Sequence, residues 1–299
     1  MKKLSKKKSE DQVFNGVMAG LPTAYYLLFF LLPCIGGLFF SFTDFGGYSL
    51  SFNMIGLTNY KKLFNDKVFW TSVINYFKMY FGIVLICFPL SYVIAVILAK
   101  NKHLKEKNIY RILYFFPVTV PTLIIAIMWM SILNPSFGAL NNFLAKFGIE
   151  EIYWLGEKKY VMKSLIFVCV WRQFGFYLVY FLAAVSNVPE SLYESARIDG
   201  ASEIYQLFHI TIPLTWESIK TSAIFFIMNC VNLGFGTVYV MTKGGPDNAS
   251  HVISSYMYFN MTKYLDYGYG SAMGVILMVI TLAMALLILK LFTRETYEF

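Results

Sequence analysis

The sequence predicts an all-α, polytopic membrane protein with six transmembrane helices. Of its residues, 58% are hydrophobic and only 14% are charged, whereas a soluble domain carries about 25% charged residues. The apolar residues gather in runs that are each long enough to cross about 30 Å of hydrocarbon as a helix. We expect the spans at residues 20–42, 73–99, 111–133, 163–187, 217–241 and 271–292.

The distribution of basic residues predicts the orientation of these spans. Lysines cluster in the N-terminal tail, residues 1–19, and in the connection 100–111 after the second span. Because basic residues favour the cytoplasmic side, we expect both termini and the segment 188–216 in the cytoplasm. Residues 20–299 then form one transmembrane domain after a cytoplasmic basic tail. The net charge of +8 reflects this orientation in a cell membrane, and we expect no nucleic-acid partner.

The remaining special residues predict no chemistry. Prolines fall inside or near the ends of the spans, where neighbouring helices can accommodate them: Pro33, Pro89, Pro117 and Pro121. The four cysteines lie in apolar spans without paired spacing, so they predict neither a disulfide framework nor a zinc site. The three histidines do not cluster, and we expect no metal site and no catalytic constellation.

Residues 188–213 predict a helix-turn-helix between the fourth and fifth spans. A proline and an acidic residue at 189–190 mark a helix start, and Gly200 allows a sharp turn. A second helix is expected over 202–209, ending ahead of Pro213, and it presents Ile204, Leu207 and Phe208. The spacing alone leaves two interpretations open, a docking site for another protein and an interfacial hairpin that lies on the membrane.

This segment resembles the EAA loop of the membrane subunits of bacterial binding-protein-dependent ABC importers, in which the permease touches its ATPase. The family pattern is Glu-Ala-Ala, three residues, Gly, nine residues, Ile-x-Leu-Pro; here Ser195 and Ile212 replace Ala and Leu. The resemblance implies that the hairpin 192–209 is the coupling element that sits in a cleft of the ATPase. The site residues that it implies are Glu194, Ser195, Ala196, Asp199, Gly200, Ala201, Ile210 and Pro213.

Three further stretches resemble sugar permeases related to the maltose and multiple-sugar systems. They are Ile132–Pro135 through Gly138–Asn141, Trp154–Gly156, and Met241–Pro246. The resemblance runs from about residue 20 to the C-terminus, and it implies the permease fold of a type I ABC importer in the bacterial cytoplasmic membrane. It also implies the partners: a second related permease in a heterodimer, two ATPase subunits, and an extracytoplasmic sugar-binding protein.

The sequence also indicates that the transport energy comes from another chain. The spans contain no acidic residue in their interiors, whereas proton- or sodium-coupled carriers place such groups near the midplane. The chain has no Walker A motif, Gly-x-x-x-x-Gly-Lys-Ser/Thr. We therefore expect a transporter subunit that is not an enzyme and has no cofactor of its own, with ATP bound by the partner subunits.

Polar residues within two spans are candidates for the substrate path. Arg172 is costly at a span centre, so it either lines a path beside Gln173 and Tyr177 or makes a structural hydrogen bond to a neighbouring helix. Asn229 and Asn232 share one face of the fifth span, with Gly236 further along. Amides hydrogen-bond sugar hydroxyls, but they also hold membrane helices together, and both interpretations stay open.

The predicted function is the permease subunit of an ABC importer that forms the path of a sugar or oligosaccharide. The alternative keeps the same machinery with glycerol-3-phosphate or another polyol-like cargo, for which Arg172 is the only cation within the predicted path. A membrane enzyme acting on lipid is disfavoured because the spans lack acid pairs and histidine clusters. The polar faces of the fourth and fifth spans disfavour a receptor or scaffold without transport.

Overall fold

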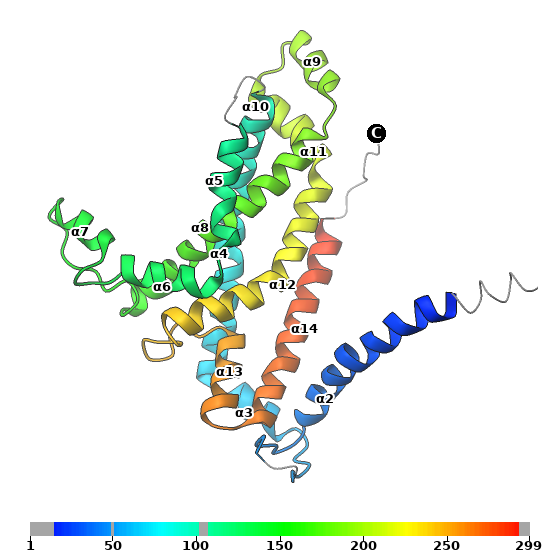
Figure 1. Ribbon diagram of the computed structural model, residues 1–299, viewed down its shortest axis with the longest axis vertical. Helices are drawn as coiled ribbons and strands as arrows, with labels where there is room; N and C mark the ends of the chain where they lie inside the picture. The colour runs from blue at the N-terminus through cyan, green and yellow to red at the C-terminus, as the bar shows by residue number, and fades with distance from the viewer. Residues whose placement is uncertain (1–14, 49–50, 102–106, 293–299) are drawn as a thin grey trace, which may run out of the picture. The chain divides into compact units, whose positions relative to one another are not determined.

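The computed structural model describes residues 15–48, 51–101 and 107–292, and their regular structure is helical apart from one isolated β-bridge (Figure 1). The lysines of the predicted basic tail before residue 15 lie outside the described residues. The elements, with η for π-helical turns, are η1 (Leu27–Leu31), α2 (Leu32–Phe40), α3 (Thr58–Asn65), α4 (Lys67–Lys100), α5 (Lys107–Thr119), α6 (Thr122–Ile132), α7 (Ala139–Ala145), α8 (Lys158–Ser186), α9 (Glu190–Ile198), α10 (Glu203–Gln206), η2 (Leu207–Thr211), α11 (Ile212–Leu214), α12 (Trp216–Met241), α13 (Ile253–Lys263) and α14 (Tyr267–Leu291).

Among the described residues, five helices are long and apolar enough to cross a bilayer: Asn15–Phe40, α4, α8, α12 and α14. They overlap five of the six predicted spans, and the prediction of an all-α polytopic chain is confirmed. The second span starts earlier than its apolar run because Asp66 caps α4. The Asp66 carboxylate accepts the backbone N–H of Val68 at 2.8 Å and of Phe69 at 3.3 Å, and these donors would otherwise have no partner at a helix start.

The third predicted span, 111–133, is made of two helices and not of one continuous helix. α5 ends at Thr119, α6 begins at Thr122, and the helix direction changes by 96° between them. Pro121 has no backbone N–H and disfavours helical geometry at the residue before it, so the helix stops there. The pair makes a sixth span only if α5 and α6 are counted together.

The chain divides into two compact units, residues 1–65 with 257–276, and residues 66–256 with 277–299. In the first unit, the buried Asn59 side chain donates hydrogen bonds to the carbonyls of Ser41 at 3.0 Å and Thr43 at 2.8 Å. Gly268 lies so close to the Thr43 carbonyl that a Cβ would overlap with it. The turn around Ser41 and Thr43 is therefore held by contacts to its backbone, one of which only a glycine at position 268 permits.

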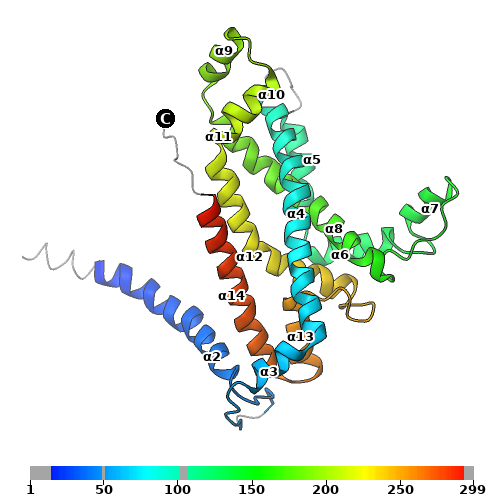
Figure 2. The same cartoon turned by 180° about the vertical axis from the view of Figure 1, so that it is seen from behind.

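The second unit is built on α4, α8 and α12, which run beside one another in both views (Figures 1 and 2). Aromatic rings from all three helices fill its core: Phe88 lies 4.5 Å from Tyr177 and 6.1 Å from Phe226, measured between ring centroids. The hydroxyl of Tyr80 donates to the carbonyl of Ala223 at 3.1 Å and ties α4 to α12. This core fixes the helices that carry the polar residues described below.

The contact of α5 with α8 depends on one glycine. At Gly175 a Cβ would overlap with the backbone carbonyl of Tyr114, and a backbone atom cannot swing aside as a side chain can. α5 therefore packs directly on the backbone of α8, as small residues permit between membrane helices.

We expect Gly175→Ala to separate α5 from α8 and to lower the free energy of unfolding by about 3 kcal/mol, at the upper end for an overpacked site. Gly82→Ala is the matched control, because a Cβ there would meet only the Ile166 side chain, at 3.0 Å. Thermal unfolding of the purified protein in detergent checks both variants. Equal midpoints for the two variants would contradict this packing.

Candidate functional site

The hairpin between α8 and α12 turns through a Schellman motif that explains the spacing of its sequence pattern. Gly200 follows the end of α9 with a φ of +78°, a conformation that glycine adopts without strain. The Ala201 N–H donates to the Ala196 carbonyl at 2.8 Å, and the Gly200 N–H donates to the Arg197 carbonyl at 3.1 Å. These two bonds define the motif, so the alanine and the glycine four residues later form one structural unit.

The second arm of the hairpin continues further than predicted. Ser202 caps α10, with its hydroxyl accepting the Tyr205 N–H at 3.3 Å. The helix was expected over 202–209, ending ahead of Pro213, but η2 carries it on into α11, which contains that proline. Pro213 stands in the first turn of α11, where its missing N–H breaks no α-helical hydrogen bond, and the π-helical turn before it re-spaces the backbone.

The inner side of the hairpin is closed by buried polar contacts. Tyr193 and Thr211 join α9 to the second arm through their hydroxyls, 3.0 Å apart. The Gln206 amide donates to the Ala201 carbonyl at 2.9 Å. All three side chains are buried, and burial raises the pKa of the Tyr193 hydroxyl, which keeps it neutral. The two arms are therefore held together as one rigid piece.

The hairpin also contacts the C-terminal end of α4, which the sequence predicts to lie on the cytoplasmic side. Lys100 lies with its ammonium 3.4 Å from the Gln206 amide oxygen and 5.3 Å from the ring centroid of Tyr193, a cation–π distance. The hydroxyls of Tyr92 and Thr215 are 2.6 Å apart and buried. A displacement of the hairpin would thus act on α4 at Lys100, and a displacement of the start of α12 would act on it at Tyr92.

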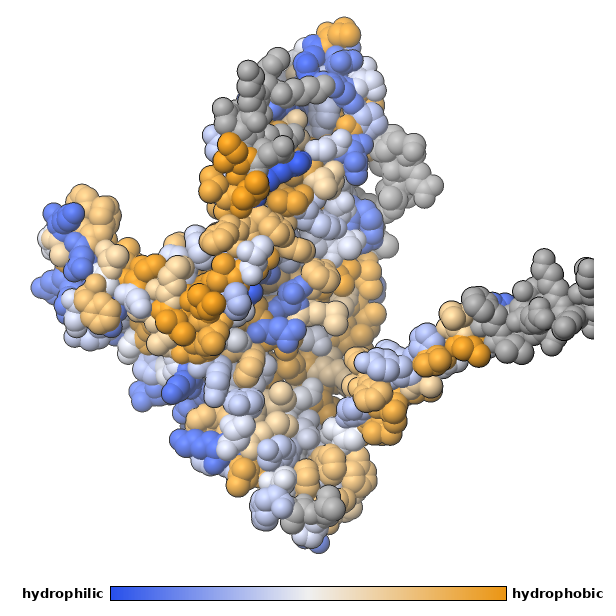
Figure 3. Space-filling model, in the orientation of Figure 1, coloured by the Kyte–Doolittle hydropathy of each residue, from blue (hydrophilic) through white to orange (hydrophobic). Residues whose placement is uncertain are grey.

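The outer side of the hairpin exposes apolar side chains. Ile198 is 87% exposed at the end of α9, Ile204 is 71% exposed and Phe208 is 59% exposed. The space-filling view shows apolar surface among hydrophilic neighbours at this end of the molecule (Figure 3). Ile198 was not among the predicted site residues; its signal in the sequence is a large apolar residue directly before the polar turn Asp199-Gly200.

The structure distributes the predicted loop residues over both sides of the hairpin. Exposed are Glu194, Ser195, Asp199 and Gly200, and half-buried are Ala196, Ala201, Ile210 and Pro213. The half-buried ones shape the turn and its junction with α11, while the exposed ones are accessible to another protein. Their role in docking stays a prediction.

A second candidate site is a cavity of about 340 Å³ enclosed by α5, α6, α8 and α12. Its lining is part polar and part aromatic: Val118, Thr122, Arg172, Gln173, Phe176, Phe225, Asn229, Asn232 and Leu233. The four polar path candidates Arg172, Gln173, Asn229 and Asn232 thus come together from two helices. The volume falls in the range of about 300–1,000 Å³ that is typical of small-molecule sites.

Arg172 enters this cavity with unused hydrogen-bonding capacity. Its Nε atom is buried and has no hydrogen-bond partner among the described residues. A buried guanidinium N–H without a partner is costly, so the structural alternative, a bond to a neighbouring carbonyl, does not account for this atom. The Asn229 side chain donates one amide N–H to the Phe225 carbonyl at 3.2 Å, and its amide oxygen can accept a hydrogen bond from a ligand.

Two of the path candidates do not line the cavity. Tyr177 is fully buried among Phe88, Phe181 and Phe226, because its ring points toward α4 and the aromatic core. Gly236 faces α6, where a Cβ would stand 3.2 Å from the Cγ2 atom of Thr122. Gly236 therefore serves the packing of α6 on α12.

Metal chemistry finds no support in the part of the chain that the structure describes. No group of three or more histidine, cysteine or acidic side chains there could hold a metal ion. The two sites instead offer hydrogen-bonding groups, aromatic rings and an exposed apolar surface.

Comparison with known proteins gives the same family along most of the chain. The model of binding-protein-dependent transport system inner membrane components matches residues 91–295. The diacetylchitobiose uptake system permease protein NgcF of Streptomyces coelicolor is 32% identical over 279 residues, covering 90% of this chain and 79% of that protein. The arabinooligosaccharides transport system permease protein AraP of Bacillus subtilis is 30% identical, covering 89% and 84%.

The fold is shared with solved transporter structures. A chain from a bacterial ABC transporter involved in the import of the acidic polysaccharide alginate aligns with a TM-score of 0.83 at 23% identity, over 99% of this chain and 100% of that chain. A second, from the alginate transporter in complex with its alginate pentasaccharide-bound periplasmic protein, has a TM-score of 0.81 at 24% identity, over 95% and 94%. These similarities confirm the predicted permease fold.

Proposed function

The chain belongs to the family of binding-protein-dependent transport system inner membrane components, and from that premise we propose that it carries a sugar or oligosaccharide through the cavity described above. It is a multi-pass inner membrane protein and the permease subunit of an ABC importer, not itself an enzyme. The proposal concerns the cargo, the residues that meet it, and the surface that receives the driving force.

The hairpin 192–209 is proposed as the surface on which the ATPase docks. The difference between the two sides of the hairpin supports this proposal. Buried hydrogen bonds hold its inner side together, while Ile198 and Phe208 are exposed on its outer side. Large exposed apolar residues beside polar ones are typical of protein interfaces. A rigid piece can transmit force from such an interface, whereas a flexible loop would absorb it.

The route of that force leads through α4. Lys100 connects the hairpin with α4, and Tyr92 connects α4 with Thr215 at the start of α12. α4 also packs along α8, which carries Arg172 and Gln173. A movement of the hairpin would therefore shift the helices that enclose the cavity. This route requires the hairpin and both termini in the cytoplasm, with residues 20–299 as one transmembrane domain, and we propose that orientation from the basic residues of the sequence.

The cavity suits a sugar. Sugar hydroxyls both donate and accept hydrogen bonds, and the cavity offers two amides from α12, a glutamine, and the Arg172 Nε–H. Phe176 and Phe225 line the same space and could stack on a sugar ring. The uptake systems named for NgcF and AraP, which act on diacetylchitobiose and arabinooligosaccharides, support a carbohydrate cargo.

The complete importer is proposed to contain a second related permease, two ATPase subunits and an extracytoplasmic sugar-binding protein. The family description, which names a binding protein, supports the last of these. The cavity is lined by residues of four helices of this single chain, and we propose that a second permease completes the path. Glycerol-3-phosphate or another phosphate-bearing cargo is less suited, because Arg172 is the one cationic residue in the lining.

We expect Gly200→Val or Glu194→Lys to abolish uptake and to weaken the association with the ATPase, while the protein stays in the membrane. Valine at φ +78° costs about 1–3 kcal/mol and disrupts the Schellman turn, and lysine reverses a charge on the exposed side. Uptake of labelled sugar and co-purification of the ATPase measure both effects.

Gly56→Val is the control for this pair, since Gly56 also has a positive φ, +60°, with nothing near a Cβ. It should leave uptake intact. Full uptake by the Gly200 and Glu194 variants would rule out the coupling role.

We expect Ile198→Ala to weaken ATPase binding by about 30-fold, the effect of losing roughly 2 kcal/mol at an interface hot spot. Ile149→Ala is the control, at an apolar side chain that is 45% exposed outside the hairpin. Titration of the detergent-solubilised permease with the ATPase gives both affinities. Equal affinity in the two variants would mean that Ile198 is not part of the interface.

We expect Asn229→Leu and Asn232→Leu to change the relative uptake of different sugars several-fold, because each removes hydrogen-bonding groups worth about 1 kcal/mol. Met228→Leu is the control on the same helix, at an exposed neighbour outside the cavity lining. Competition between labelled sugars in whole cells measures the preference. Unchanged preference would assign both asparagines to helix packing alone.

A further inference from the structure

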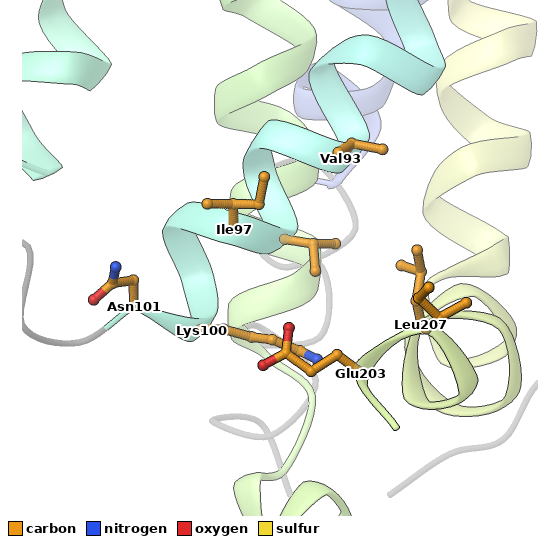
Figure 4. A pocket seen from close by; sticks show the side chains of 8 residues that line it. Val93, Ile97, Lys100, Asn101, Glu203 and Leu207 are labelled. Carbon is orange, nitrogen blue, oxygen red and sulfur yellow. The ribbon is translucent and has the colours of Figure 1, made fainter. Parts of the chain in front are cut away.

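A groove of about 400 Å³ lies between the end of α4 and the start of the second hairpin arm. Its lining comes from the last turns of α4 and from α10 with the first residue of η2 (Figure 4). None of the predicted site residues lines it, and it is separate from the cavity around Arg172. Its volume is again that of a small-molecule site.

The groove lies at the level where the bilayer meets water. Between Lys78 and Lys100, α4 carries no charged residue, and this stretch rises about 30 Å, the thickness of the hydrocarbon core. Lys100 therefore lies at the level of the lipid headgroups, and the turns just before it lie among the acyl chains.

The walls of the groove match this division. Along α4, Val93 and Ile97 stand one turn apart and are 45% and 56% exposed, and Ile204 of α10 is 71% exposed. At the other end, Lys100 and Glu203 reach toward each other from α4 and α10 (Figure 4). The groove thus has an apolar part within the membrane and a charged part at its surface.

The two opposite charges line the same groove without forming an ion pair with each other. Lys100 has three N–H donors, of which one makes a long contact of 3.4 Å with Gln206. Glu203 is exposed and offers acceptors only. A ligand that carries both a negative and a positive group would satisfy both side chains at once.

We propose that this groove binds one phospholipid with an ethanolamine headgroup. Its acyl chain lies along Val93 and Ile97, its phosphate is bound by the Lys100 ammonium, and its own ammonium donates to the Glu203 carboxylate. An anionic headgroup would be repelled by Glu203, and a choline headgroup has no N–H to donate. Because α10 belongs to the hairpin, this lipid would stiffen the second arm; that consequence rests on the coupling role proposed above, whereas the binding itself does not.

Native mass spectrometry of the full transporter complex tests the proposal. The complex is incubated with equal amounts of phosphatidylethanolamine, phosphatidylcholine and phosphatidylglycerol of the same acyl chains. We expect one retained phosphatidylethanolamine per groove, in at least about 10-fold excess over each of the others, as a loss of one charge-assisted hydrogen bond implies.

Three variants locate the site. Ile97→Trp fills the apolar part and should abolish the retained lipid. Glu203→Lys removes the acceptor and adds a cation, and should shift the preference to phosphatidylglycerol. Ile86→Trp is the matched control: it lies three turns earlier on the same face of α4, is 52% exposed, and does not line the groove, so binding should persist.

Equal retention of the three lipids, or the same loss from Ile86→Trp as from Ile97→Trp, would overturn the proposal and indicate ordinary surrounding lipid. Crosslinking of the Ile204→Cys variant to another subunit, with no lipid retained, would overturn it in favour of a protein occupant. The Glu194→Lys permease separates this proposal from the coupling role: Glu194 lies in α9 and does not line the groove, so this variant should lose uptake and still retain the lipid.

Discussion

Within the bilayer every polar group must find its partner inside the protein, because no water is available to replace it. The arrangement of the second unit depends on this constraint. Tyr76 and Tyr80 of α4 donate their hydroxyls to carbonyls of α12, at 3.3 Å and 3.1 Å, and so fix those two helices against each other. The buried Arg172 Nε, which no described group satisfies, lines the cavity, and we propose it as a contact for the cargo.

The same constraint connects the two candidate sites. α4, whose Tyr76 and Tyr80 hydroxyls bond to α12, reaches from the hairpin to the core beside the cavity. At its end, Lys100 contacts both arms of the hairpin; further along, Phe88 packs between α8 and α12. The hairpin itself is rigid because its turn satisfies the carbonyls at the end of α9. The break at Pro121 gives α6 a direction different from α5, and α6 thereby closes one wall of the cavity.

Sequence similarity to relatives shows the family of this protein but not which carbohydrate it carries. Relatives at about 30% identity share the permease architecture, yet the uptake systems that they are named for act on different carbohydrates, among them diacetylchitobiose and arabinooligosaccharides. In the roles proposed here, the hairpin contacts an ATPase whatever the cargo, whereas the cavity contacts the cargo itself. The lining of α12, with Asn229 and Asn232, is accordingly where we expect this permease to differ functionally from its relatives.

The sequence by itself determined the properties that depend on neighbouring residues. Hydrophobic composition and run length predicted six spans, five of which are single long helices, and Gly200 predicted the turn, because a helix end and its glycine are set within a few residues. The signal for the break, Pro121, is also local, but a proline is compatible with a continuous span in a helix bundle, so the sequence does not predict the break. Arg172, Gln173, Asn229 and Asn232 were proposed from their polarity alone, and only the packing of α8 on α12 brought them to one cavity.

The tertiary structure alone decided which polar side chains line the cavity or the groove and which ones pack into the core. Tyr177 is close to Gln173 in sequence, yet it packs into the core, because the position of α4 determines which part of α8 is covered. The groove with Lys100 and Glu203 joins residues about a hundred positions apart, which no local pattern reveals. The exposure of Ile198 likewise depends on the buried bonds of Tyr193 and Gln206, which turn the other side of the hairpin inward. Local chemistry fixes the elements, and long-range packing fixes their faces.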